Sequence, residues 1–237
     1  MKRNQSGFTL IEIAIVLVII GLLLGGVLKG QELINSARVK NLATDFKNIP
    51  VFIYGYQDKF RALPGDDRQV DTHLTGLNPG CAGGICPIPA ANVTAGNGII
   101  DGNWNSNVQA DESYLFWQHV RLAGLASGSV TLGAADYLPT NATGGTIGIQ
   151  SGTNVVANSP MLGVAGGNPI RGSYIICSSG ILGKFVKQLD LQMDDGNTAG
   201  GSMMATDTVV APYAIGAVAT PTLNIVDSNS YTVCMGV

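Results

Sequence analysis

The chain has 237 residues, a formal net charge of −3 and only 12% charged residues. This length suits one membrane anchor followed by one or two compact lobes. The charged residues form no basic stripe, so direct binding of nucleic acid is not expected.

The N-terminal segment consists of a short basic leader followed by a long apolar run, Phe8–Leu28, which contains one carboxylate, Glu12. As a helix these 21 residues span about 31 Å, enough to cross the hydrocarbon core of a bilayer. A carboxylate inside such a span is costly and usually marks a partner. Lys2 and Arg3 before the run, with an uncharged-to-acidic chain after it, predict a cytoplasmic N-terminus and an exported remainder.

Two ordinary explanations of this segment fit poorly. A cleavable signal peptide has a shorter apolar region, and its small-residue cleavage site follows that region. Here the small residue, Gly7, comes before the apolar run. A plain membrane anchor explains the length of the run but not the presence of Glu12.

The sequence SGFTLIE at residues 6–12, followed by an apolar helix, resembles the N-terminus of type IV pilins and of the pseudopilins of type II secretion. In that family a prepilin peptidase cuts after the glycine, here Gly7, and the new N-terminus, here Phe8, is N-methylated. The resemblance implies a leader at residues 1–7 and a transmembrane and filament-core helix at residues 8–28. It is close over roughly the first 50 residues and weaker beyond them.

Glu12 has a physical role in this interpretation. After cleavage, Phe8 carries a free amine that is cationic near neutral pH. Glu12 lies four residues further on, at helical spacing. In a filament core of low dielectric, the amine and the carboxylate of adjacent subunits would attract strongly, and leaving either unpaired would be costly. Glu12 is therefore a candidate for setting the axial register between subunits.

The apolar periodicity continues past the membrane span at steps of three and four residues, to about Tyr56. Residues 29–57 are therefore predicted to form an amphipathic continuation of the helix. A helix from Phe8 to Tyr56 would be about 73 Å long. Pro50 should bend or end it, and the apolar spacing beyond Pro50 favours a bend.

Residues 58–237 are predicted to form the periplasmic or extracellular lobe. The segment Tyr54–Asp67 begins as helix, breaks at Pro64-Gly65 and resembles the post-helix segment of a pseudopilin-like group. A long loop follows at Val70–Trp104. Asp111 is expected to cap a helix that ends at Leu122, and Ser179 to open a second helix that reaches Met193 and closes at Gly196.

Short strands are expected between and after these helices, at residues 129–132, 146–150, 173–177, 223–226 and 230–235. Because there are too few helices to connect parallel strands, antiparallel pairing is favoured. The predicted fold class is α+β, with a long N-terminal helix packed on a small antiparallel sheet that carries long loops and extra helices. The pilin resemblance implies the same architecture.

Four cysteines lie in the exported part of the chain, where an even number favours disulfides. Three pairings are open. The short CAGGIC loop favours Cys81–Cys86, which leaves Cys177 to pair with Cys234. The second bond also resembles the C-terminal disulfide loop of type IV pilins. The alternative is a metal site made of Cys81, Cys86 and His73, although its spacing matches no standard zinc pattern.

Three aspartates, Asp190, Asp194 and Asp195, crowd the C-terminal end of the predicted second helix, where negative charge opposes the helix dipole. Lys187, Arg61 or solvent could compensate this charge. The other interpretation is a calcium ion held by the carboxylates and by loop carbonyls. This segment resembles the DDG segment of the pseudopilin-like group, and some pseudopilins bind calcium in a C-terminal loop. Calcium is thus the one candidate cofactor.

The chain is not expected to be an enzyme. His73 and His119 are its only histidines, and a packed or surface role is expected for His119. The common hydrolase, zinc-protease and nucleotide-binding motifs are missing from the sequence. The chain is expected to be a substrate instead, cut at Gly7 and methylated at Phe8.

Two classes of function remain. The resemblance implies a structural subunit of a type IV pilus-like filament or of a type II secretion pseudopilus. Its partners would be other pilins or pseudopilins, the prepilin peptidase, the inner-membrane assembly platform and the lipid bilayer. It would cross the inner membrane once before it enters the filament. The alternative is a membrane-anchored periplasmic binding module, which would have no need of cleavage after Gly7.

Overall fold

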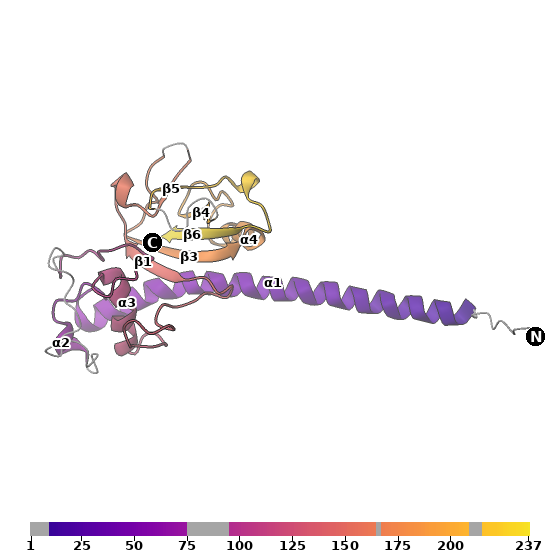
Figure 1. The fold of residues 1–237 in the computed structure, drawn as a ribbon, viewed down its shortest axis with the longest axis horizontal. Coiled ribbons are helices and arrows are strands. Elements are labelled where there is room, and N and C mark those ends of the chain that lie inside the picture. Colours follow the sequence, from indigo (N-terminus) through magenta and orange to yellow (C-terminus); the bar gives the residue numbers. More distant parts are fainter. Residues whose placement is uncertain (1–9, 75–94, 165–166, 209–214) are drawn as a thin grey trace, which may run out of the picture. The chain divides into compact units, whose positions relative to one another are not determined.

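The structure, a computed structural model, describes residues 10–74, 95–164, 167–208 and 215–237 (Figure 1). The chain divides into two compact units, Met1–Arg38 and Val39–Val237, and the second is called the lobe below. The elements are α1 (Leu10–Phe60), α2 (Val70–His73), α3 (Glu112–Leu122), β1 (Ile147–Ser151), η1 (Val156–Asn158), β2 (Met161–Leu162), β3 (Tyr174–Leu182), α4 (Gly183–Met193), β4 (Met203–Asp207), β5 (Ala217–Val218), η2 (Thr222–Asn224) and β6 (Ser230–Gly236).

The part of α1 in the first unit is apolar and exposed. An 18-residue window of this helix has a mean hydropathy of 2.8, and none of the window is buried. Large side chains are left uncovered by the rest of the chain, such as Leu22, which is 73% exposed. Among the described residues, α1 is the one helix long and apolar enough to cross a membrane.

The part of α1 in the lobe buries one face. Its buried residues recur at steps of three and four: Val39, Leu42, Ala43, Phe46, Ile49, Ile53 and Tyr56. This spacing places them on a single stripe of the helix, which enters the main hydrophobic core up to Ile53, while Tyr56 packs in a smaller cluster with Val70 and Leu74. Pro50 lies inside the helix and does not end it, and α1 continues one turn beyond Tyr56 to Phe60.

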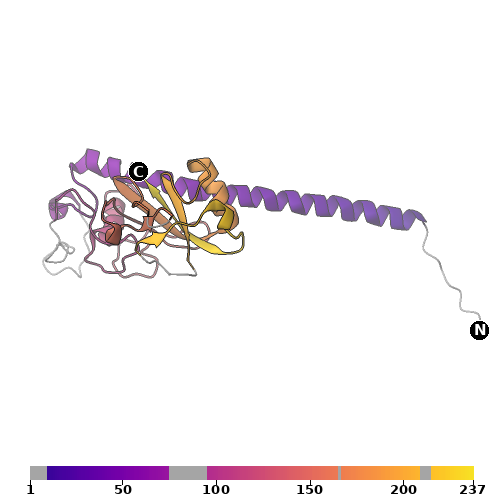
Figure 2. The same ribbon diagram turned by 90° about the horizontal axis from the view of Figure 1, so that it is seen from above.

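The lobe contains a four-stranded antiparallel sheet with the order β1-β3-β6-β4, and a separate two-stranded parallel pair, β2-β5. Helix α4 contacts β3, β4 and β6, and α3 contacts β1. Figure 2 shows the same elements from above. The predicted α+β fold, with a long N-terminal helix, a small antiparallel sheet and extra helices, is confirmed.

Three local predictions were wrong, and one strand was missed. Ser179 lies within β3 and not at the start of a helix, because residues 178–182 continue the pairing with β6 across a register shift. Helix α4 therefore begins only at Gly183. The segment 223–226 contributes to the short 3₁₀ helix η2, residues 129–132 form no strand, and β4 was not anticipated.

Candidate functional site

The N-terminal motif is described only from Leu10 onward. Glu12 lies in α1, two residues after the first described residue. Gly7 and Phe8 lie outside the described residues. Cleavage after Gly7, methylation of Phe8 and the register role of Glu12 therefore stay predictions.

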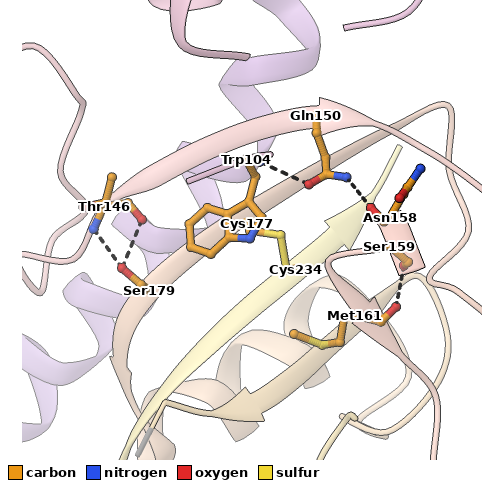
Figure 3. The surroundings of a disulfide bond; sticks show 9 residues. All are labelled: Trp104, Thr146, Gln150, Asn158, Ser159, Met161, Cys177, Ser179 and Cys234. Atoms are coloured by element: carbon orange, nitrogen blue, oxygen red, sulfur yellow. Dashed lines mark hydrogen bonds between the residues drawn. A yellow bond between two sulfur atoms is a disulfide. The ribbon is translucent and has the colours of Figure 1, made fainter. Parts of the chain in front are cut away.

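A disulfide joins Cys177 on β3 to Cys234 on β6 (Figure 3). The two residues face each other in the antiparallel pairing, with their Cα atoms 4.0 Å apart, and both are fully buried. The bond therefore links the two central strands of the sheet. Cys81 and Cys86 lie outside the described residues, and with them both the Cys81–Cys86 bond and the alternative metal site with His73.

Trp104 packs with this disulfide in a second hydrophobic cluster, which also contains Met161. The Trp104 backbone N–H donates to Gln150 Oε1 at 3.1 Å, and Gln150 Nε2 donates to the Asn158 carbonyl at 3.0 Å. Figure 3 shows the indole beside the two sulfur atoms. The polar contacts hold the 104 segment along β1, so the disulfide is shielded from solvent.

The three aspartates near the end of α4 have separate surroundings. Asp194 Oδ2 accepts hydrogen bonds from the backbone N–H groups of Ser202 and Met203, at 2.7 and 2.9 Å. Asp195 Oδ1 accepts from the N–H of Asn197 at 2.9 Å. Asp190 is buried, and burial together with the two neighbouring carboxylates raises its pKa to about 6.

Lys187 does not compensate these aspartates, because it pairs with Asp227 at 2.9 Å. Within the described ranges, no group of three His, Cys, Asp or Glu side chains is arranged to hold a metal ion. The carboxylate of Asp194 instead closes the turn that leads into β4. The calcium prediction therefore has no ligand set in this part of the chain, and it stays a prediction.

The segment after α1 is anchored by its two adjacent aspartates. Asp66 accepts hydrogen bonds from the N–H groups of Gly96, Asn97 and Gly98, the last two at 3.1 and 2.7 Å. This arrangement binds residues 63–67 to the loop that begins at residue 95. The acidic segment at Asp66 therefore has a structural role, which is to hold this loop in place.

Asp67 forms the second anchor. Its carboxylate accepts from the Tyr56 hydroxyl at 2.7 Å and from the Gln69 N–H at 2.9 Å, and it contacts His73 Nδ1 at 2.7 Å. Because Tyr56 belongs to α1 and His73 to α2, the buried carboxylate of Asp67 joins the two helices.

His119 completes the attachment of this segment to α3. It is buried, and its Nδ1 accepts the backbone N–H of Gly65 at 2.9 Å, so the ring proton sits on Nε2. Burial lowers the pKa of His119 to about 4. The histidine is therefore a neutral packed residue, one of the two roles that the sequence suggested for it.

Glu112 is a buried acid that no pattern in the sequence indicated. It opens α3, and its Oε2 accepts the Asp101 N–H at 2.8 Å. Burial, together with the nearby charges of Asp66 and Asp101, raises its pKa to about 8, so the side chain is neutral at neutral pH. Asp111 is the N-cap residue but makes no side-chain cap hydrogen bond. It accepts a bond from the Ser106 hydroxyl instead.

Comparison with known protein families identifies one motif. The family described as the prokaryotic N-terminal methylation motif matches residues 2–28. No curated protein and no solved structure matches the chain. The matched range includes Gly7, Phe8 and Glu12 and most of the exposed apolar part of α1. The chain thus carries the prokaryotic N-terminal methylation motif, the prepilin-peptidase motif of type IV pilins and pseudopilins.

Proposed function

We propose that this protein is a structural subunit of a type IV pilus-like filament or of a type II secretion pseudopilus, assembled from the inner membrane. One observation carries the proposal: the methylation motif leads directly into the exposed apolar part of α1, and the apolar run up to Leu28 contains a single acid, Glu12. A peptidase site, a membrane-spanning length and a charge inside the span are together what a filament-core helix requires.

The exposed apolar surface needs a cover. Each large apolar side chain moved out of water contributes about 1.5–3 kcal/mol, and the first part of α1 presents many of them. Before assembly the bilayer supplies the cover, and after assembly the helices of neighbouring subunits replace it. The same surface therefore serves first as an anchor and then as an assembly interface.

Glu12 supports the filament over a plain anchor. A carboxylate inside a bilayer is costly by about 2.5–3.5 kcal/mol or more, so a simple tether gains nothing from it. In a filament the processed amine of Phe8 from a neighbouring subunit can neutralise it. The proposed topology places the lobe in the periplasm, an oxidising compartment that suits the Cys177–Cys234 disulfide.

The test compares Glu12→Ala with Glu32→Ala in cells that contain the prepilin peptidase and the assembly platform. Glu32 is an exposed acid on the same helix, paired with Lys29, and serves as the matched control. We expect wild type and Glu32→Ala to enter filaments, and Glu12→Ala to be cleaved but to stay in the membrane. A normal filament yield for Glu12→Ala would remove the register role. A wild-type chain that stays uncut in the membrane and does not enter filaments would favour the anchored binding module.

A further inference from the structure

A cavity of about 750 Å³ lies in the lobe where α1 ends. It is bounded by the segment after α1, by α2, by the loop at residues 96–98 and by the start of β3. Its aromatic walls include Phe60, His73 and Tyr174, and the Phe60 and His73 rings stack with centroids 5.2 Å apart. None of the N-terminal motif contributes to this cavity.

The carboxylates that line the cavity are already used. Asp66 and Asp67 are 2% and 5% exposed. Three backbone amides bind Asp66, while the Tyr56 hydroxyl and the Gln69 amide bind Asp67. A cation entering the cavity would find their oxygens engaged by donors. The floor of the cavity therefore offers little to a positively charged ligand.

The arginines that line the cavity differ from these acids. Arg61 and Arg68 are both exposed, and neither forms an ion pair with any residue in the described part of the chain. Guanidinium groups are always charged and recognise carboxylates in a planar, two-pronged geometry. The exposed charged side chains that line the cavity are thus both cations, and cations of this kind suit a carboxylate.

The backbone at Arg61 is a second, independent observation. Arg61 has φ of +56°, and no other non-glycine residue in the described ranges has a positive φ. It directly follows α1, and its N–H donates to the Gln57 carbonyl at 2.8 Å. Helices usually place glycine at this position, because a side chain there is strained. Lys59 already supplies a cation to the last turn of α1, so the helix dipole alone does not account for Arg61.

The lobe also carries an exposed carboxylate on a different surface. Asp195 is exposed at the turn after α4. Asp190 and Asp194 lie close to it and make the electrostatic potential around this turn more negative. Leu191, on the last part of α4, is 73% exposed. Figures 1 and 2 both show α4 and α2 at opposite ends of the lobe.

We propose that the cavity at Arg61 and Arg68 of one copy binds the Asp195 turn of a second copy. This inference rests on the proposed function, since a filament is what brings copies together in sequence. The two surfaces are different and lie at opposite ends of the lobe, so the contact is head-to-tail, the kind that can repeat from copy to copy. Repetition of such a contact extends a helical assembly.

Charge reversal in the full-length chain tests this contact. Arg61→Glu and Asp195→Arg are made separately and together, and assembled protein is measured in sheared filaments and as cross-linked ladders in membranes. We expect each single variant to reduce assembly about tenfold and the double variant to recover most of it, because the opposite charges are restored. Arg171→Glu and Asp136→Arg, at exposed positions outside the cavity and the turn, are the matched controls and should assemble normally.

The variant Arg61→Gly distinguishes the contribution of the Arg61 side chain to assembly from its effect on the stability of the lobe. Glycine relieves the strained φ, so the melting temperature should be unchanged or higher, whereas assembly should fall as far as in Arg61→Glu. Normal assembly of Arg61→Gly, an unaffected Asp195→Arg, or no recovery in the double variant would each overturn the proposal. All variants should still lose Met1–Gly7 and reach the membrane. Failure of the wild type to be cleaved would count against the proposed function instead.

Discussion

The two parts of α1 belong to one continuous helix but differ in apolar content and in surroundings. In the first unit, the side chains from Leu10 to Leu28 are exposed, and the described residues cover none of the most apolar window. In the lobe, one stripe from Val39 to Tyr56 is buried against the sheet and α3. Within the part of the chain that the structure describes, one continuous helix therefore has packing partners along one part and none along the other.

This difference shows what determines the role of an apolar helix. In the lobe, the stripe is narrow and polar residues fill the other positions, so burial on one side is sufficient. In the first part, apolar residues surround the helix, so only a bilayer or a ring of other helices can cover it. The stability of the lobe should therefore depend on the second part of α1 and not on the first.

The largest expected effect comes from Phe46→Ala, which removes a side chain that is 1% exposed in the core. We expect the free energy of unfolding of the lobe to fall by about 3–5 kcal/mol. The matched control is Leu17→Ala, at a position that is 63% exposed, and it should leave lobe unfolding unchanged. Denaturant unfolding of the full chain in detergent, followed by near-UV circular dichroism, measures both. Equal losses would show that the two parts of α1 do not differ in this way.

Removal of the disulfide should have the next largest effect. The double variant Cys177→Ser/Cys234→Ser loses the link between β3 and β6 and places two hydroxyls in a buried cluster. We expect a loss of about 2–4 kcal/mol in lobe stability. The helical signal of the apolar part of α1 should not change. Thermal melts of the oxidised wild type and the double variant provide the comparison, and equal melting temperatures would contradict it.

Glu112 should make the lobe less stable as the pH rises. Its folded-state pKa of about 8 lies above the ordinary value of 4.5, so the folded chain holds a proton that the unfolded chain releases. This contribution is complete below about pH 4.5 and is lost as the pH rises toward 8. Between pH 6.5 and 8.5 we expect the wild type to lose about 1–2 kcal/mol relative to Glu112→Gln, which cannot ionise.

That pH window isolates Glu112 from the other shifted groups. Burial lowers the pKa of His119 to about 4, so its destabilising protonation occurs at lower pH. The pKa values of Asp45 and Asp190 rise only to about 6. Urea unfolding of both proteins across the window measures the difference. Parallel pH profiles would mean that Glu112 is ionised in the folded lobe.

The smallest expected effect is that of Tyr56→Phe. This change removes the hydroxyl that donates to Asp67 at 2.7 Å and keeps the buried ring. We expect a loss of about 1–2 kcal/mol, because the acceptor is a buried carboxylate. Tyr54→Phe, at a more exposed position on the same helix, is the control and should be nearly neutral. A neutral Tyr56→Phe would show that water replaces the hydroxyl.

The periodic parts of the fold could be predicted from the sequence. The spacing of Leu42, Phe46, Ile49 and Ile53 predicted the lobe part of α1, including its passage through Pro50. The predicted limits of α3, from a cap at Asp111 to Leu122, agree closely with the observed helix for the same reason. Local patterns of this kind arise from one face of one element, so they do not depend on knowing its neighbours.

The missed features depend on contacts between distant segments. Ser179 resembled a helix start, but pairing with β6 extends β3 past it to Leu182. The buried state of Glu112 follows from the neighbouring Asp66 segment, which lies far away along the chain. No periodicity marks β4, whose strand is defined by its pairing with β6.

The candidate functional residues also divide into those set by local sequence and those set by contacts between distant segments. The motif at Gly7, Phe8 and Glu12 is local and could be identified from sequence, and the family comparison supports it. The cavity at Arg61 is formed by four separate segments, and the positive φ of that residue is a property of the folded backbone. Neither could be predicted from residue order.

The most direct test of the central claim is the intact mass of the protein recovered from sheared filaments and from the membrane fraction. We predict a chain that lacks Met1–Gly7 and carries one added methyl group on Phe8. Such a chain in sheared filaments indicates a pilin, and the same chain confined to membrane and periplasm indicates a pseudopilin. An uncut chain in both fractions would contradict the filament-subunit account.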